Sequence, residues 1–133
     1  MSRRGLQVLV LLFGAVAVVF GSLGVVAGVD GVLDGGSATA SLDSEFRYFA
    51  AWYVCAGVLL LKSARHVETE GVLLRVIAGA LFLGALGRLF SFVEVGRPST
   101  FAVVLMSIEF TVAVVVVLWQ LAVARRDNDV ARA

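Results

Sequence analysis

Four long apolar runs separated by short polar segments set the pattern of this chain. They span residues 6–27, 44–62, 71–93 and 101–124. Each is close to the roughly 20 residues that a helix needs to cross a bilayer. Inside hydrocarbon a helix satisfies all of its own backbone groups. The pattern therefore predicts an all-α membrane protein, a four-transmembrane-helix bundle that forms a single domain over residues 1–133.

The segments between the runs are polar or rich in glycine. We expect residues 28–43 to form a loop, because Gly35-Gly36-Ser37 breaks a helix. Ser41 or Asp43 is expected to cap the second helix. The basic residues before the first run resemble a signal peptide, but that run exceeds the roughly 7–15 residues of a signal core. We therefore expect a retained first span.

The basic residues are distributed unevenly between the two sides of the predicted membrane. The N-terminus, the middle polar segment with its flanking helix ends, and the tail hold Arg3, Arg4, Lys62, Arg65, Arg75, Arg125, Arg126 and Arg132. The opposite side holds Arg47, Arg88 and Arg97. Because cytoplasmic segments carry the excess of Lys and Arg, we expect a multi-pass protein of the plasma membrane with both termini cytoplasmic.

Composition supports a membrane protein and excludes several other classes. The chain is 60% hydrophobic, with a mean hydropathy of +0.98, whereas a soluble domain is about half apolar. The net charge of +1 gives no basic face for nucleic acid. A single cysteine, Cys55, and a single histidine, His66, exclude an intramolecular disulfide and give no basis for a metal site. We expect no cofactor.

Two charges lie well inside apolar runs, away from the first and last turns. Arg88 is in the third run and Glu109 is in the fourth. A charge in hydrocarbon costs several kcal/mol unless it is paired or wetted. The short segment 94–100 makes the third and fourth helices antiparallel neighbours. The sequence therefore predicts an Arg88–Glu109 ion pair in the outer half of the membrane, with Arg47 nearby.

Small residues predict which helix faces pack closely. Ala80, Gly84, Gly87 and Ser91 share one face of the third helix with Arg88. Gly21 and Gly24 lie in the first run, and Gly28 directly follows it. Small residues let membrane helices approach each other closely. We therefore expect Arg88 to point toward other helices. Arg75, near the start of the third helix, is expected to reach the headgroups.

Several short motifs resemble those of the DUF4345 family, which comprises short bacterial four-helix membrane proteins of unknown function. They are Ser44-Glu45-Phe46-Arg47-Tyr48, Tyr53, Gly57, Gly87-Arg88-Leu89-Phe90-Ser91, Gly96-Arg97-Pro98 and Glu109. The resemblance covers nearly the whole chain. It implies that the characteristic polar set is Glu45, Arg47, Arg88, Ser91 and Glu109, and it implies no activity. The chain departs from the family pattern at Tyr48, where phenylalanine is common, and in lacking a proline after Glu109.

The sequence leaves several functions open. The pair could only set helix register, or it could form an outward-facing polar core in a non-enzymatic bundle. Such a core would bind a lipid, a small ligand or a membrane partner, including a second copy of the chain. The alternatives are a small proton-coupled transporter and an intramembrane lipid-modifying enzyme that uses Glu109. Small multidrug transporters carry their carboxylate in the first helix, and residues 6–27 have no charge. We expect no catalytic residue, because catalysis wants a second matched group beside Glu109.

Overall fold

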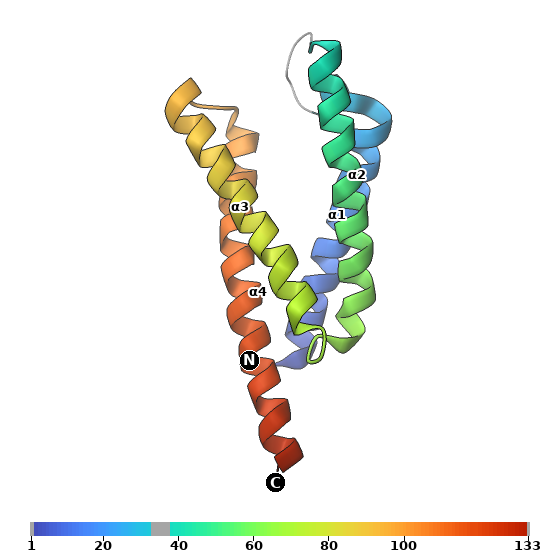
Figure 1. The fold of residues 1–133 in the computed structure, drawn as a ribbon, viewed down its shortest axis with the longest axis vertical. Coiled ribbons are helices and arrows are strands. Elements are labelled where there is room, and N and C mark those ends of the chain that lie inside the picture. Colours follow the sequence, from blue (N-terminus) through green and yellow to red (C-terminus); the bar gives the residue numbers. More distant parts are fainter. Residues whose placement is uncertain (1, 33–37, 133) are drawn as a thin grey trace. The chain divides into compact units, whose positions relative to one another are not determined.

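The described chain is helical throughout, apart from short connections. The computed structural model describes residues 2–32 and 38–132, with side chains as far as Arg125. Its elements are α1 (Arg3–Val32), α2 (Ala40–Ser63), the short 3-10 helix η1 (Ala64–His66), α3 (Gly71–Val95) and α4 (Thr100–Arg132) (Figure 1). These described ranges contain no strand, so the predicted all-α class is confirmed. Every helix extends beyond the apolar run that predicts it.

Three of the four helices are long and apolar enough to cross a membrane. Among the described residues these are Arg3–Val32, Gly71–Val95 and Thr100–Arg125. The helix α2 is less apolar because its first two turns contain Asp43, Glu45 and Arg47. The chain is therefore a helical protein that is apolar enough to be embedded in a membrane, and a fourth span remains a prediction.

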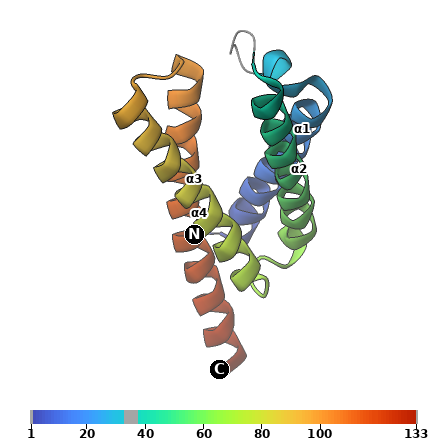
Figure 2. The ribbon, with the colours of Figure 1, turned by 45° about the horizontal axis from the view of Figure 1, so that its top comes forward.

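The helices form two compact units. One unit comprises residues 7–65, which contain most of α1 and all of α2. The other comprises the described residues of 1–6 and 66–133, with α3 and α4. In each unit two long helices run side by side in opposite directions (Figures 1 and 2).

Glycine brings α1 and α2 close together. A Cβ built on Gly57 would lie 2.7 Å from the carbonyl oxygen of Gly14, and one on Gly14 would lie 3.0 Å from that of Gly57. A Cβ on Gly21 would lie 2.7 Å from the carbonyl oxygen of Ala50, and one on Gly24 would lie 2.7 Å from the Cβ of Ala50. The two backbones are thus nearly in contact, as small residues allow in membrane helices. The predicted packing roles of Gly21 and Gly24 are confirmed.

The predicted loop over residues 28–43 is wrong at both ends. Helix α1 continues to Val32, although Gly28 interrupts it with a φ of 72°, in the left-handed region that glycine enters without a Cβ penalty. Helix α2 begins at Ala40 and is capped by Thr39, whose hydroxyl accepts from the backbone N–H of Leu42 at 3.3 Å. Neither Ser41 nor Asp43 is the cap. Gly35-Gly36-Ser37 lies outside the described residues.

The unit of α3 and α4 is an antiparallel hairpin, as predicted. Gly96, with a φ of 113°, follows the last residue of α3. Phe82 on α3 meets Phe110 on α4 edge to face, with ring centroids 5.0 Å apart. Helix α4 continues to Arg132, beyond the predicted end at Ala124.

The predicted small-residue face of α3 makes no close contact within its own hairpin. A Cβ on Gly84 or Gly87 would have no atom within 4 Å, and Ser91 and Ala80 are exposed. The helices of this hairpin instead meet through buried alanines, Ala78 and Ala85 on α3 and Ala113 on α4. Alanine serves here because its single methyl group also permits a close approach.

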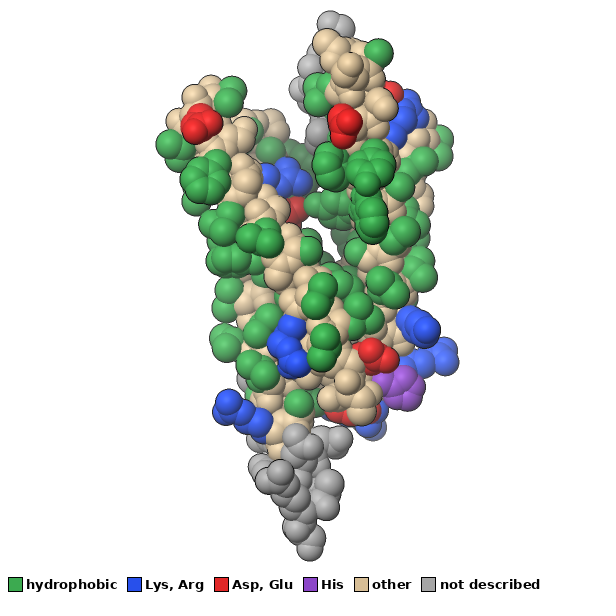
Figure 3. All heavy atoms as spheres, viewed as in Figure 1, with side chains coloured by type: hydrophobic (Ala, Val, Ile, Leu, Met, Phe, Trp, Pro, Cys, Tyr) green, Lys and Arg blue, Asp and Glu red, His purple; other side chains and the backbone are tan. Residues whose placement is uncertain are grey.

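Large apolar side chains cover most of the visible surface (Figure 3). Many of them are largely exposed, among them Val26, Phe90, Val93 and Val95, which are 68–85% exposed. Monomeric soluble proteins rarely expose apolar patches beyond a few hundred Å². The exposed side chains therefore agree with a protein whose outer surface contacts lipid.

Candidate functional site

Arg88 and Glu109 form the predicted ion pair between α3 and α4. The Nε of Arg88 lies 3.1 Å from Oε2 of Glu109, and its Nη2 donates to Oε1 at 3.4 Å. The Nη2–Oε1 contact has hydrogen-bond geometry, whereas the Nε–Oε2 contact is an ion pair without it. The prediction of direct contact is confirmed.

The two partners differ in exposure. The side chain of Glu109 is 10% exposed, whereas that of Arg88 is 40% exposed. The carboxylate is therefore enclosed, and the guanidinium is the part of the pair that another molecule can reach. This asymmetry is the main electrostatic feature of the site, because it presents a positive group on an otherwise apolar helix.

The hairpin positions the pair through its apolar neighbours. Ala85 is fully buried one turn before Arg88, and Ala113 is 3% exposed one turn after Glu109. Phe110, which follows Glu109, contacts Phe82 across the hairpin. These contacts lie on the side of the pair away from the turn that joins α3 to α4. The close approach of the helices there leaves the two charged side chains only a short distance to bridge.

Of the predicted polar set, Glu45 belongs to the other compact unit, and Ser91 does not contact the pair within the hairpin. Glu45 on α2 and Ser91 on α3 are exposed. Neither has a hydrogen bond or an ion pair within the described residues. The structure thus brings together Arg88 and Glu109, and it leaves Ser91 outside their contact although Ser91 lies on the same helix.

Arg47 lies in the unit of α1 and α2, at the break in α1. Its Nε contacts Oδ2 of Asp43 at 2.7 Å, and its Nη1 donates to the carbonyls of Val25 at 2.6 Å and Val26 at 3.0 Å. Oδ1 of Asp43 accepts from the backbone N–H of Val29 at 3.0 Å. The break at Gly28 frees backbone groups on either side, and the Asp43–Arg47 pair satisfies them. Arg47 therefore faces α1.

The pair alters the acidity of Asp43, which precedes the apolar run of α2. Hydrogen bonding from the Arg47 guanidinium, and then from the Val29 N–H, lowers the pKa of Asp43 below its ordinary value of 3.8. A carboxyl with a lowered pKa in the folded state stabilises that state fully above its unfolded pKa. The contribution is lost as the pH falls through the folded value. The contacts that the Asp43–Arg47 pair makes at Gly28 should therefore persist throughout the neutral range and weaken only below pH 3.8.

Arg47→Gln is expected to raise the pKa of Asp43 back toward 3.8, because it removes the largest cause of the lowering. Carbon-13 NMR of the Asp43 carboxyl over an acid titration would measure the change. Arg97→Gln is the matched control, since Arg97 is an exposed residue of the turn after α3. The interpretation fails if Asp43 already titrates at its ordinary value in the unmodified chain.

The sequence analysis missed a second polar contact in the hairpin. Arg75 does not simply reach outward, because its Nη1 donates to Oε1 of Gln120 at 2.7 Å. Gln120 is only 1% exposed, and a Cβ on Gly71 would collide with its amide. The available signal was a single glutamine in the apolar run 101–124. A neutral side chain raises no charge penalty, so it did not stand out.

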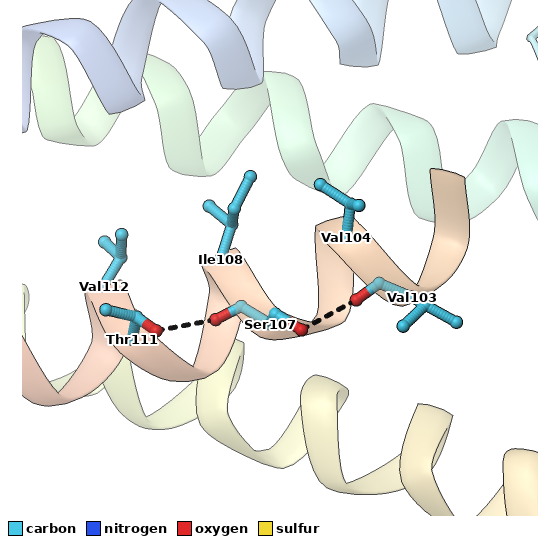
Figure 4. Close-up of a pocket in the computed structure, with 6 residues that line it drawn as sticks. All are labelled: Val103, Val104, Ser107, Ile108, Thr111 and Val112. Carbon is cyan, nitrogen blue, oxygen red and sulfur yellow. Dashed lines mark hydrogen bonds between the residues drawn. The ribbon is translucent and has the colours of Figure 1, made fainter. Parts of the chain in front are cut away.

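The hydroxyl groups of α4 do not contact the pair. Ser107 donates to the carbonyl of Val103 at 2.9 Å, and Thr111 donates to that of Ser107 at 2.8 Å. These residues line a shallow hollow on α4 together with Val103, Val104, Ile108 and Val112 (Figure 4). Because both hydroxyls are used within their own helix, the hollow is effectively apolar. It lies on the residues that flank Glu109 in sequence.

No cluster of metal ligands occurs in the part of the chain that the structure describes. No group of three or more His, Cys, Asp or Glu side chains there could hold an ion. The chemistry that the site offers is therefore that of its arginine and carboxylate: charge-assisted hydrogen bonding to a polar group from the membrane or from solution.

Comparison with known proteins identifies a family but no characterised relative. The sequence profile of the family described as Domain of unknown function (DUF4345) matches residues 5–120, which is most of the chain. The matched range includes both members of the Arg88–Glu109 pair. Searches of curated proteins and of solved structures found no match.

Proposed function

This chain belongs to the DUF4345 family, whose function is unknown, and we propose that it is a non-enzymatic membrane protein with a binding site at the Arg88–Glu109 pair. The ligand is a lipid, a small molecule, or a polar group of a membrane partner, including a second copy of the chain. The pair sits on two helices that are apolar enough to cross a membrane.

The observation that carries this proposal is the 40% exposure of the Arg88 side chain beside an enclosed Glu109. A guanidinium in hydrocarbon needs partners for all of its donors, because each unsatisfied polar group there costs several kcal/mol. Glu109 satisfies only one edge of the guanidinium. A pair that only set helix register would leave fewer donors unsatisfied if both of its partners were enclosed. The exposed edge therefore favours a binding role.

The proposed arrangement in the membrane is a four-span bundle in the plasma membrane with both termini cytoplasmic. Helix α2 has 24 residues, or about 36 Å at 1.5 Å per residue, which exceeds the roughly 30 Å hydrocarbon core. It also packs along α1 at two levels, through Gly57 and through Ala50. A helix of this length that packs along a spanning helix is supported as a span itself, despite its polar first turns.

This arrangement places the pair in the outer half of the membrane. Arg88 lies seven positions before Val95, the end of α3, or about 10 Å along the helix axis. Glu109 lies nine positions after Thr100, the start of α4, or about 14 Å. An arginine side chain extends several ångströms toward the interface, so lipid headgroups of the outer leaflet come within its reach.

The orientation predicts which positions react with a membrane-impermeant thiol reagent added to intact cells. Cys55 is exposed, so the background is Cys55→Ser. Ser41→Cys and Arg97→Cys should react from outside because they lie at the outer ends of α2 and of the hairpin. Arg65→Cys should react only after the cells are opened. Reaction of Arg65→Cys in intact cells would show that the orientation is inverted.

The binding site predicts that the purified chain retains a ligand. Mass spectrometry of material extracted from the protein in mild detergent should find a lipid or small molecule that is depleted from Arg88→Leu/Glu109→Leu. This double change removes both charges together, so no lone charge is left to destabilise the fold. Arg97→Leu is the control and should retain the ligand. Equal retention by all three forms would rule out a site at the pair.

A further inference from the structure

The accessible charge of the Arg88–Glu109 pair is positive, and from this we infer that its ligand presents an oxyanion, such as the phosphate of a lipid headgroup or a free phosphate. The inference rests on the proposed function, since it names the chemistry of the ligand at the same site. The ligand of the pair is then an anion and not a cation.

The uncommitted donors of Arg88 support an anionic ligand. A guanidinium has five N–H donors and no acceptor. Arg88 directs Nε and Nη2 at Glu109, and its Nη1 donates to no group in the described part of the chain. By contrast, Arg47 makes three hydrogen bonds, one to Asp43 and two to backbone carbonyls of α1. Arg88 therefore has donors to spare, in the planar geometry that matches phosphate and carboxylate oxygens.

The enclosure of Glu109 opposes a cationic ligand. A cation would have to reach a carboxylate that is 10% exposed and displace or bypass the guanidinium already bound to it. It would also approach Arg88, a like charge, in surroundings of low dielectric where repulsion is strong. An exporter of organic cations needs an accessible carboxylate, and the geometry of this pair supplies the opposite.

The net charge of the site gives a test with opposite signs for the two ligand classes. Glu109 neutralises Arg88, so an anion that binds to the pair leaves the site with a net negative charge. Glu109→Gln removes the competing carboxylate and leaves Arg88 fully positive. Anion affinity should therefore rise in Glu109→Gln, whereas a cation that depends on Glu109 would be lost. Arg88→Gln should weaken anion binding.

The experiment uses the full chain in dodecyl maltoside and measures bound ligand by native mass spectrometry. Three probes are titrated separately: phosphatidylglycerol, inorganic phosphate and tetraphenylphosphonium. We expect phosphatidylglycerol or phosphate to bind, with affinity reduced about ten- to a hundredfold in Arg88→Gln, the range expected for a hydrogen bond to a charged group. Arg75→Gln on the same helix makes the same charge change and should leave affinity unchanged.

The probes distinguish a lipid headgroup from a free anion, and they separate the chemistry of the ligand from the existence of the binding site. Binding of phosphatidylglycerol that inorganic phosphate does not displace identifies a lipid headgroup, and binding of phosphate alone identifies a small free anion. Tetraphenylphosphonium binding that is lost in Glu109→Gln would overturn the anion assignment and leave the proposed binding site standing. No probe bound, together with no co-purified ligand, would overturn both.

A variant that keeps the fold separates loss of binding from loss of structure. Arg88→Gln leaves an enclosed carboxylate, and the protein could lose structure for that reason alone. The double variant Arg88→Gln/Glu109→Gln has no charge at the site. It should keep the helical circular dichroism spectrum of the unmodified chain and still bind the anion about ten- to a hundredfold more weakly. Binding by this folded double variant at unchanged affinity would contradict the inference.

Discussion

Replacing Arg88 alone or Glu109 alone with leucine is expected to destabilise the protein more than replacing both. Each single change leaves its former partner as a lone charge on an apolar helix, and an uncompensated buried charge is strongly destabilising. The double change removes the whole polar contact and leaves two aliphatic side chains. We expect each single change to cost about 1–3 kcal/mol of unfolding free energy, below the value for fully buried pairs because Arg88 is partly exposed.

The two single changes should also differ from each other. Glu109→Leu leaves Arg88, whose side chain is already 40% exposed and can extend toward the interface. Arg88→Leu leaves a carboxylate that is 10% exposed and has no comparable route to water. Arg88→Leu should therefore be the more damaging change.

Equilibrium unfolding in mixed micelles with a rising fraction of dodecyl sulfate would measure all three variants. Arg97→Leu controls for the loss of a surface charge at the same end of the hairpin. Strictly additive effects of the two single changes would show that the 3.1 Å contact contributes no coupling energy. Harmless single changes would show that neither charge is costly at its depth.

Sequence reasoning found the Arg88–Glu109 pair because two strong constraints apply to it. A charge in an apolar run needs a partner, and the short turn at 94–100 leaves few candidates. These constraints do not apply to the Gln120–Arg75 contact or to the Asp43–Arg47 ion pair. Gln120 is neutral, and Asp43 and Arg47 lie at the polar end of α2, where water could serve equally well. Their partners depend on tertiary contacts that no spacing in the sequence specifies.

The glycines show a different limit of the sequence. An apolar helix that meets lipid on one side and protein on another has apolar residues all round, so the periodicity that identifies a buried face disappears. Gly84 and Gly87 therefore predicted close packing as well as Gly21 did, and only Gly21 has it. Gly28 was read as the start of a loop, whereas contacts from Asp43 and Arg47 support a short continuation of α1 beyond it.

The glycine contacts between α1 and α2 lead to the second large expected effect, that Gly57→Ala weakens the packing of this unit. The new Cβ would lie 2.7 Å from the carbonyl oxygen of Gly14 and 2.8 Å from the backbone nitrogen of Val18. Both are backbone atoms, so a side-chain rotation cannot relieve the overlap and the helices must move apart. Overpacking of this kind costs about 1–3 kcal/mol, and a leucine at the same position should cost more.

Gly87→Ala is the matched control for Gly57→Ala, because it makes the same chemical change in a helix of similar composition where a Cβ meets no atom within 4 Å. Alanine is a better helix former than glycine by about 1 kcal/mol, so this variant should be neutral or slightly stabilised. Unfolding in mixed micelles would compare the two. Because helix propensity acts equally on both, the difference between them isolates the cost of the α1–α2 contact. Equal stability would show that the backbones of α1 and α2 are not in contact at Gly57.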